Sequence, residues 1–550
     1  MRSQRNSPIK TKILRLSMLS LSIFIILISR LAWIQTAKSN EYRLAAIRQR
    51  AREVKVYPPR GIIYDRNLIP LTNRSRVTTM FVIKDQVIDN EESIKFIMEY
   101  TDANKKSIVE NSSDKILEFP LKKTLKDKKL PKGIFISEKT LRYDEMNMLS
   151  HVIGYVKRSD NSGESGIEKV FDDILKNNEV GSIYFEVDNK KKRIIPGGGF
   201  VVVENEEFKK PNSVKLTIDY HIQKIVEEAI DEENVNGAVV VAEVDTGDIV
   251  AVASRPNFDQ DEVDAYLKKD NMELYNKAIQ VSYPPGSLFK IVVLLAALEE
   301  EPDIANEYFY CSGFEKLNDL VIKCNKEGGH GYISAEEAFA KSCNSVFIQI
   351  GKRVGSKKII DMAQKMGYGR KLNIGLLEEV AGNLPYGEEL IGPSVGNISI
   401  GQGKIEVTPL QVTNMMMILA NNGVEKDLSI VKGIVTEDGR MVKEFKKNEE
   451  KRIISKENSQ IVNKFMAEVV LRGTAKKLNL EDIGGACGKT GSAQAILNGE
   501  NTIHGWFSGY YPRENPKYVI TVFVEEGFSG SKSAVPIFGK IAREIYMKNR

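Results

Sequence analysis

The residues best suited to chemistry form three short groups in the second half of the chain: Ser287–Lys290 (SLFK), Ser342–Asn344 (SCN) and Lys489–Ser492 (KTGS). A serine hydroxyl is a poor nucleophile unless a base takes its proton, and a lysine whose pKa is lowered by burial can be that base. Together the groups indicate acyl transfer through a serine. The first pattern alone is weak evidence, because Ser-x-x-Lys recurs at Ser112 and Ser529. The inference therefore depends on the order of the groups and on the elements that carry them.

The segment around Ser287 is typical of a buried helix that begins after a tight loop. Pro284–Gly286 (PPG) ends the loop, and residues 288–298 (LFKIVVLLAAL) are apolar on nearly every helical face. Ser287 and Lys290 are three residues apart, so they share one face and the amine can reach the serine Oγ. The alternative is an N-cap serine with a coincidental lysine. A lysine within an apolar helix favours the functional interpretation, because its burial is unfavourable without a role.

A second helix is predicted around Ser342. Ser334–Glu337 (SAEE) resembles a capping box, and the helix that it opens includes Ser342 and Asn344. If this helix lies beside the first pair, Ser342 can relay a proton and Asn344 can hold a substrate amide. The alternative, ordinary polar residues on a solvated face, stays open from this segment alone.

The third group is predicted on an exposed or edge strand, because it follows a glycine-rich stretch (GGACG) and precedes two strand-like segments. Gly491 adds to the glycines that permit a close approach of the backbone to a ligand. Lys489 and Thr490 suit a substrate carboxylate, and the backbone amides of Ser287 and Ser492 can form an oxyanion hole. A glycine-rich turn between strands is the alternative.

The composition indicates folded domains. The 550 residues are 42% hydrophobic and 28% charged, which is enough apolar material for sizeable cores. A net charge of +5, from 79 basic and 74 acidic residues, gives no reason to expect a nucleic-acid partner. Residues 36–211 show no catalytic constellation and are interpreted as a non-catalytic spacer or docking platform. Residues 212–550 predict one α+β domain, with strands at 238–244, 249–254, 502–510 and 518–524 and a closing helix at 534–547.

A membrane span is predicted near the N-terminus. Residues 13–35 are largely apolar and long enough to cross a bilayer core, which needs about 20 residues. Trp33 suits a membrane interface. No small-x-small cleavage site follows, which favours a retained signal anchor over a cleaved signal peptide. We expect residues 1–12 to form a short cytoplasmic tail and residues 36–550 to lie outside the cell membrane.

Three of the four cysteines and one histidine form a series that reaches the second group: Cys311, Cys324, His330 and Cys343. The set predicts a tetrahedral Cys3His zinc site, since soft thiolates and imidazole suit zinc. Such a metal can fix the segment that carries Ser342. A disulfide between Cys311 and Cys324, which an extracytoplasmic location favours, and free buried cysteines are the alternatives.

The three groups resemble a class B penicillin-binding protein, and four further motifs extend the resemblance over almost the entire extracytoplasmic chain. They are Arg60–Arg66 (RGIIYDR), Gly166–Glu168 (GIE), Ser399–Gly403 (SIGQG) and Gly473–Ala475 (GTA). The resemblance implies an α+β protein with a single N-terminal transmembrane helix, a mixed β-rich pedestal or dimerisation-type domain, and a C-terminal transpeptidase domain of the penicillin-recognising, serine β-lactamase-like fold. It also implies a peptidoglycan D,D-transpeptidase of the bacterial cell membrane.

The resemblance further implies a role for each site residue. Ser287 attacks the penultimate D-alanine carbonyl of a stem peptide, and an amine of a neighbouring stem resolves the acyl-enzyme. The other implied roles are Lys290 as base, Ser342 as proton relay, Asn344 as a substrate-amide contact, and Lys489 and Thr490 as anchors of the carboxylate. The acyl transfer needs no cofactor, but some penicillin-binding proteins carry a structural metal where this chain has its cysteine and histidine series.

The implied partners are peptidoglycan stem peptides, β-lactam antibiotics, the cell membrane, a membrane glycosyltransferase and proteins of division or elongation. A membrane-anchored β-lactam sensor and a β-lactamase are the alternative functions. A sensor needs an output domain, for which residues 1–12 are too short. A β-lactamase needs an activated deacylating water, to which we assign no residue, and has no use for residues 36–211. The residues do not distinguish septation, elongation and sporulation.

Overall fold

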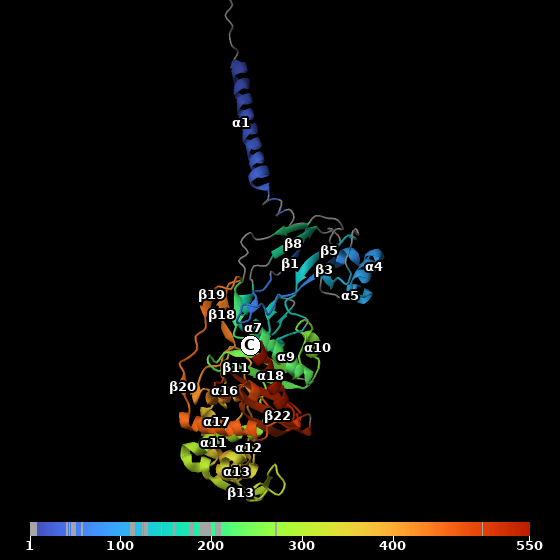
Figure 1. Cartoon of the computed structure of the whole chain (residues 1–550). Helices are drawn as coiled ribbons and strands as arrows, with labels where there is room; N and C mark the ends of the chain where they lie inside the picture. The colour runs from blue at the N-terminus through green and yellow to red at the C-terminus, as the bar shows by residue number, and fades with distance from the viewer. Residues whose placement is uncertain are drawn as a thin grey trace, which may run out of the picture. The chain divides into compact units, whose positions relative to one another are not determined.

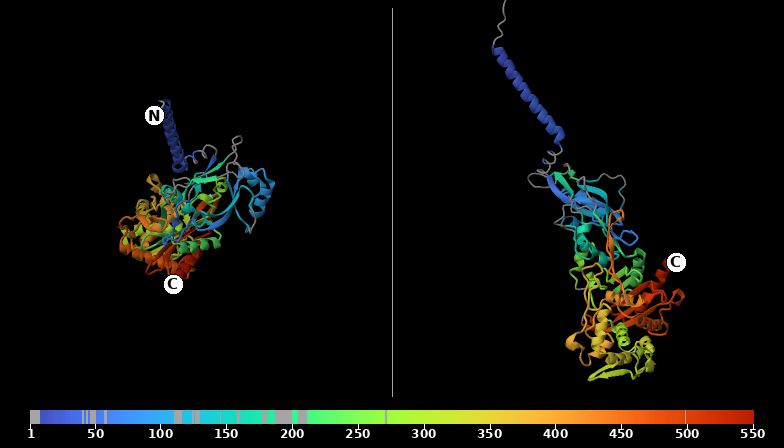
Figure 2. Two further views of the ribbon diagram at one scale, coloured as in Figure 1. Left: turned by 90° about the horizontal axis from the view of Figure 1, so that it is seen from above. Right: turned by 90° about the vertical axis from the view of Figure 1, so that its left-hand side faces the viewer.

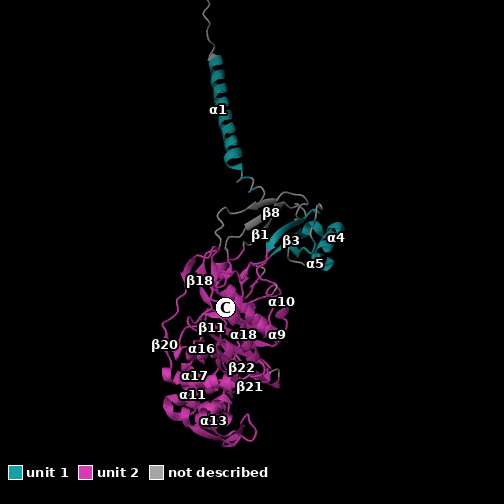
Figure 3. Cartoon of the chain, in the orientation of Figure 1, with its two compact units in different colours: residues 1–58, 76–139, 178–209 teal, residues 59–75, 140–177, 210–550 magenta. Residues whose placement is uncertain are grey.

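The structure of the chain, a computed structural model (Figure 1), describes residues 8–39, 42, 45, 51–56, 59–109, 116–123, 125, 130–144, 146–157, 160–176, 181–186, 200–203, 211–269, 272–497 and 499–550. It has two compact units (Figure 3): unit 1 contains residues 1–58, 76–139 and 178–209, and unit 2 contains residues 59–75, 140–177 and 210–550. Segments 59–75 and 140–177 cluster with unit 2, although they precede the predicted boundary at residue 211. Residues 1–7 of the predicted tail, and Ser112, lie outside the described residues.

The N-terminal helix α1 spans Pro8–Ala37 and appears as one long rod in Figure 2. Its length and apolar composition over Ile9–Ala37 are sufficient to cross a membrane. The helix covers the predicted span at residues 13–35 and extends beyond it at both ends. The guanidinium of Arg30 lies 4.6 Å from the ring centroid of Trp33 near the end of the helix.

Unit 1 contains a small α+β core. Strand β3 (Arg76–Ile83) lies between β4 (Ile116–Pro120) and β5 (Ile134–Thr140), and the short helices are α3 (Lys84–Val87), α4 (Glu91–Tyr100) and α5 (Lys105–Val109). The Asn90 side chain caps α4 by accepting hydrogen bonds from two backbone N–H groups of its first turn. A second sheet has the order β1-β8-β9 (Ala51–Val56, Gly181–Glu186 and Phe200–Val203).

Unit 2 is built on a five-stranded sheet whose neighbouring strands are all antiparallel. The order is β12 (Ile249–Arg255), β11 (Gly237–Glu243), β23 (Tyr518–Val524), β22 (Glu500–Tyr511) and β21 (Cys487–Leu497). The predicted strands near both ends of the 212–550 segment are confirmed, and they pair in this one sheet.

Helices cover both faces of this sheet. On β22, Phe507 packs edge-on against Phe538 of α18 (Ala534–Lys548), at 4.7 Å between ring centroids. The next residue, Ser508, points to the opposite face, where its hydroxyl bonds that of Thr521 and Thr521 accepts a hydrogen bond from Thr413 of α16 (Pro409–Ala420). Helix α9 (Tyr220–Glu232) packs beside α18. The apolar α16 is buried along its whole length, which explains its continuous hydrophobic sequence.

Further helices pack beyond α16 and complete the part of unit 2 that carries the SLFK, SCN and KTGS motifs (Figure 1). These helices are α11 (Lys290–Glu300), α12 (Ala335–Ala340), α13 (Asn344–Val354), α14 (Ser356–Lys365), α15 (Ser394–Ser399) and α17 (Lys456–Leu471). Hairpins β13–β16 (Tyr308–Cys311 and Gly331–Ser334) and β14–β15 (Phe314–Leu317 and Leu320–Lys323) connect α11 to α12. A further sheet has the order β19-β18-β10-β2 (Met441–Glu444, Val431–Val435, Ser213–Leu216 and Ile63–Tyr64).

Candidate active site

Ser287 lies in a tight turn that opens the buried helix. Gly286–Phe289 form a single 3-10 turn, η2, and the α-helix α11 continues from Lys290. Gly286 has a φ of +54°, and a Cβ there would stand 2.6 Å from the carbonyl oxygen of Ser492, so only glycine fits. The predicted helix start near Ser287 is confirmed, with its first turn tightened. Ser287 itself is half-buried.

Main-chain contacts hold the loop in front of Ser287. The N–H and C=O of Tyr283 pair with those of Val407, at 2.9 Å in both directions. The N–H of Gly286 donates to the carbonyl oxygen of Gly401 at 3.0 Å. A Cβ at Gly401 would lie 2.2 Å from the Gly286 carbonyl oxygen, so a side chain is excluded there. The Ser399–Gly403 motif therefore supports the loop that carries Ser287. In the sequence, only the family resemblance had singled out this motif.

Lys290 is completely buried, and its amine bonds the second group. Nζ donates to the carbonyl oxygen of Ser342 at 2.7 Å, to Ser342 Oγ at 3.3 Å and to Asn344 Oδ1 at 2.8 Å. Burial lowers the pKa of Lys290 to about 7, an effect that the neighbouring Cys343 and Cys324 partly oppose. Near neutral pH a substantial fraction of this amine is unprotonated, which is the form that can act as a base.

Ser342 lies in a turn between two helices. Helix α12 ends at Ala340, and α13 begins at Asn344. Ser342 has a φ of +57°, a left-handed conformation through which an α-helix cannot continue. The prediction that one helix contains Ser342 is therefore wrong. The predicted cap is confirmed, because the Ser334 side chain accepts a hydrogen bond from the Glu337 N–H at 3.1 Å.

Lys489 is also completely buried, on the edge strand β21. Its Nζ donates to Ser342 Oγ at 3.1 Å and to the carbonyl oxygen of Thr490 at 3.0 Å. The predicted edge position of the strand is confirmed. Lys489 is nevertheless buried, because α17 packs on the strand and the Phe339 ring centroid lies 5.6 Å from the amine. Burial, assisted by the charge of Lys290, holds the pKa of Lys489 well below its usual value.

Two buried amines thus meet at one hydroxyl. Ser342 Oγ lies 3.3 Å from Lys290 Nζ and 3.1 Å from Lys489 Nζ. Two ammonium groups so close together repel strongly in a protein interior, which favours loss of a proton from at least one of them. A hydroxyl between two amines of lowered pKa can pass a proton from one side of a reaction to the other.

The rest of the third group borders the turn that holds Ser287. A Cβ at Gly491 would lie 2.7 Å from the carbonyl oxygen of Pro285, so this glycine permits the close approach of β21. Thr490 Oγ1 bonds the hydroxyl of Thr474 at 2.6 Å, and Ser492 is exposed. Sequence reasoning assigned no role to Thr474. The only signal for it was its place in the GTA motif of the resemblance.

Hydrogen bonds join four of the predicted site residues directly: Lys290, Ser342, Asn344 and Lys489. Asn344 is the first residue of α13, and its Nδ2 donates to the carbonyl oxygen of Lys323 at 3.1 Å. Glycines place β21, with Thr490, Gly491 and Ser492, beside the turn of Ser287. The bond from Lys290 to Ser287 Oγ and the catalytic role of each residue stay predictions.

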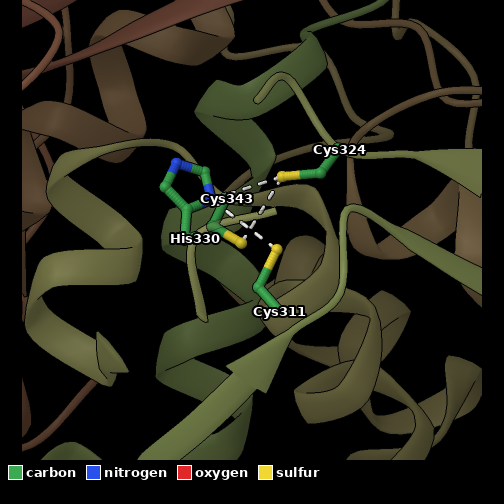
Figure 4. Close-up of side chains that lie close together, drawn as sticks. All are labelled: Cys311, Cys324, His330 and Cys343. Atoms are coloured by element: carbon green, nitrogen blue, oxygen red, sulfur yellow. Dashed lines mark hydrogen bonds between the residues drawn. The ribbon is translucent and has the colours of Figure 1, made fainter. Parts of the chain in front are cut away.

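The predicted metal ligands converge at the start of α13 (Figure 4). The thiols of Cys311, Cys324 and Cys343 and a ring nitrogen of His330 all lie within 4.8 Å of one another. Three of the separations are 3.6 Å: both Cys311 Sγ and Cys324 Sγ to His330 Nδ1, and Cys324 Sγ to Cys343 Sγ. Tetrahedral zinc with ordinary Zn–S and Zn–N bonds separates its ligands by about 3.5 to 3.8 Å, so these three separations match that ion. All four cysteines of the chain are free thiols in the structure.

Comparison with known families places this fold and site in one class. The family described as "Penicillin binding protein transpeptidase domain" matches residues 237–543, and "Penicillin-binding Protein dimerisation domain" matches residues 55–196. The chain therefore belongs to the class B penicillin-binding proteins, a family of serine-type transpeptidases. The resemblance drawn from the motifs is confirmed, as is the mixed α+β fold.

Individual relatives agree with this assignment. The chain is 30% identical to "Stage V sporulation protein D" of Bacillus subtilis, over 98% of this chain and 86% of that protein. It is 25% identical to "Peptidoglycan D,D-transpeptidase MrdA" of Escherichia coli, over 94% of this chain and 91% of that protein. Among solved structures, the complex between penicillin-binding protein PBP2 and MreC from Helicobacter pylori superposes with a TM-score of 0.66 at 23% identity, covering 90% of this chain and 99% of that chain.

Proposed function

We propose that this peptidoglycan D,D-transpeptidase uses Ser287 as its nucleophile and the Lys290–Ser342–Lys489 cluster as its proton-transfer machinery. The observation that carries the proposal is the convergence of two buried amines on Ser342 Oγ, at 3.3 and 3.1 Å. A buried lysine without a carboxylate partner is unfavourable for stability, so two of them beside a predicted nucleophile indicate function. The family assignment favours the transpeptidase over the β-lactamase and the sensor.

The proposed acylation step uses these residues in order. Neutral Lys290 takes the proton of Ser287 as Oγ bonds the carbonyl carbon of the penultimate D-alanine. The backbone N–H groups of Ser287 and Ser492 stabilise the oxyanion. The carbon–nitrogen bond then breaks, and the departing D-alanine amine receives a proton through Ser342. An amine from a second stem peptide attacks the ester, loses its proton to the same machinery and releases Ser287.

The substrate contacts use the remaining residues of the cluster. Lys489 and Thr490 face the terminal carboxylate, with Thr490 oriented by the Thr474 hydroxyl at 2.6 Å. Asn344 contacts a substrate amide, since its Oδ1 has acceptor capacity beyond the bond from Lys290. β-Lactams resemble the D-Ala-D-Ala end, and we expect them to acylate Ser287 and deacylate slowly.

The apolar helix α1 supports a single-pass anchor, with residues 36–550 on the outer side of the cell membrane. The Helicobacter pylori PBP2 relative was solved with MreC, and another relative of the same fold belongs to a peptidoglycan synthase complex. We propose equivalent partners here, a membrane glycosyltransferase and proteins of division or elongation.

We also propose that Cys311, Cys324, His330 and Cys343 hold one structural zinc ion. The ion would link the two strand pairs between α11 and α12 to the turn that carries Ser342. No step of the acyl transfer involves the ion. Metal analysis of the purified protein should find about one equivalent of zinc, lost in Cys311→Ala. Cys487→Ala is the control, because that buried thiol lies outside the cluster and should leave zinc unchanged. Zinc-free wild-type protein prepared without chelators contradicts the proposal.

The activity is tested by turnover. The purified protein should release D-alanine from a D-Ala-D-Ala substrate and join the remainder to an added acceptor amine, while hydrolysing nitrocefin slowly at most. Ser287→Ala should remove both release and transfer. Ser112→Ala is the matched control, because it alters a Ser-x-x-Lys sequence in unit 1. Fast nitrocefin turnover without transfer would identify a β-lactamase instead.

A further inference from the structure

The loop that carries Ser287 is anchored by a tyrosine whose hydroxyl reaches a buried carboxylate. Tyr283 is 6% exposed, and its ring lies 4.0 Å from that of Phe523 between centroids. Its hydroxyl donates a hydrogen bond to Glu525 Oε1 at 2.9 Å. The phenol remains the donor, because burial and the charge of Glu525 raise the pKa of Tyr283 far above its usual value.

The carboxylate is itself fixed on both sides. Glu525 is 8% exposed, and its Oε2 forms an ion pair with the ammonium of Lys277, which is 3% exposed. The Glu525 N–H donates to the carbonyl oxygen of Asn236 at 2.9 Å, and the Lys277 N–H donates to Ser254 Oγ at 3.0 Å. The pair therefore sits on the framework of the five-stranded sheet. A hydrogen bond to an ionised acceptor is stronger and better directed than one between neutral groups.

The same loop has a second side-chain support. The indole N–H of Trp506, on β22, donates to the carbonyl oxygen of Pro284 at 3.0 Å. Trp506 also packs against Phe523, at 4.4 Å between centroids. Tyr283 and Pro284 are thus held by strands β22 and β23 and the residue that follows β23, while Ser287 lies only four residues after Tyr283.

We propose that Glu525 is a positioning residue for the nucleophile, and that it acts through the Tyr283 hydroxyl to fix the loop that presents Ser287. The inference rests on the proposed role of Ser287. The carboxylate touches neither substrate nor reacting atoms. Loss of the tyrosine bond lets the loop shift against β21, and small displacements of a nucleophile lower the rate of the chemical step more than they lower binding.

The sharpest variant is Tyr283→Phe, because it removes one hydroxyl and keeps the buried ring. With a fluorescent penicillin, we expect the first-order acylation constant to fall about ten-fold while the dissociation constant of the initial complex stays the same. Tyr143→Phe is the matched control, since that buried hydroxyl lies 3.5 Å from Glu168 Oε1 in another part of unit 2. Wild-type acylation by Tyr283→Phe overturns the proposal, as does an equal loss in Tyr143→Phe.

A second comparison separates positioning from stability. Glu525→Gln should slow acylation, whereas Glu526→Gln, at the neighbouring exposed residue, should not. Adding Tyr283→Phe to Glu525→Gln should slow acylation little further, because both act through one bond. Fully multiplicative losses contradict the proposal. If the Ser287→Ala protein still reacted with penicillin, Ser287 would not be the nucleophile. That result differs from a failure of the positioning proposal, in which Ser287→Ala is inactive but Tyr283→Phe reacts normally.

Discussion

Two of the buried clusters of charged side chains in unit 2 differ in charge pattern: one pairs opposite charges, and the other brings two amines together. In the structural cluster, Arg60 Nε lies 2.8 Å from Glu168 Oε2, and Arg142 Nε lies 2.7 Å from Glu168 Oε1. Asp172 Oδ1 receives a further bond from Arg60 at 2.7 Å. In the site cluster, by contrast, Lys290 and Lys489 approach the same hydroxyl with no carboxylate between them among the described contacts.

The difference shows how one fold can use buried charge for two purposes. Opposite charges at bonding distance satisfy one another, so the Arg60 cluster joins the RGIIYDR and GIE motifs into fixed geometry. Like charges cannot do this, and burial instead lowers the pKa of each lysine, that of Lys290 to about 7. The first cluster therefore fixes local structure, and the second is the one that we propose for the chemistry.

The largest effect should come from Lys290→Met. We expect acylation by a fluorescent penicillin to fall about 10³-fold, because the base is lost. The melting temperature should stay the same or rise, since an unpaired buried amine is replaced by an apolar side chain. Lys352→Met, at an exposed lysine of α13, is the control. Acylation within a few-fold of wild type would show that Lys290 is not the base.

The opposite pattern is expected for Arg60→Met. This substitution removes the guanidinium that pairs with the carboxylates of Glu168 and Asp172. The free energy of unfolding should therefore drop by about 3–5 kcal/mol. Acylation by the molecules that remain folded should be unchanged. Denaturant unfolding measures the first effect, and the exposed Arg440→Met is its control. If Arg60→Met were stable but acylated slowly, the Arg60 cluster would act in the chemistry and not in the stability of the fold.

The pH dependence should follow the site cluster. Because the protonated amine cannot accept a proton, acylation should fall about ten-fold per unit as pH drops below the Lys290 pKa of about 7. It should level off above that value. Rates measured at constant ionic strength, beside melting temperatures at each pH, separate titration of the base from unfolding. A flat profile down to about pH 5 is inconsistent with a lysine base.

The smallest effect is expected at Thr474. Thr474→Val removes the hydroxyl that orients Thr490, which should slow acylation about five-fold, the equivalent of about 1 kcal/mol. Thr413→Val is the matched control, since Thr413 bonds Thr521 at 2.9 Å within the α16 interface. That variant should change stability and leave acylation alone. Equal acylation by both variants would leave Thr474 without a role at the site.

Much of this arrangement could be predicted because local sequence encodes it. The apolar run after Ser287 requires a buried helix, and Ser334 requires a helix start, so both elements appear where the sequence indicates. The strands near residues 240 and 520 are apolar and β-branched, which is typical of a central position in a sheet. Local patterns of this kind need no knowledge of distant residues.

The wrong helix at Ser342, and the features that the sequence did not indicate, depend on tertiary packing. The local sequence around Ser342 favours a continuous helix. The left-handed φ of Ser342 arises because α12 ends and α13 begins on either side of it, which brings the serine between the two lysines. Burial of Lys489 depends on α17 covering an edge strand. The Tyr283–Glu525 bond joins residues 242 positions apart, and neither belongs to one of the three groups.

The most direct test of the central claim is the location of the covalent adduct. After reaction with a β-lactam, intact-mass spectrometry should show one added antibiotic mass, and peptide mapping should assign it to Ser287. The Ser287→Ala protein should show no added mass while retaining the wild-type melting temperature. An adduct on another residue, or one that persists in Ser287→Ala, would contradict the assignment of the nucleophile.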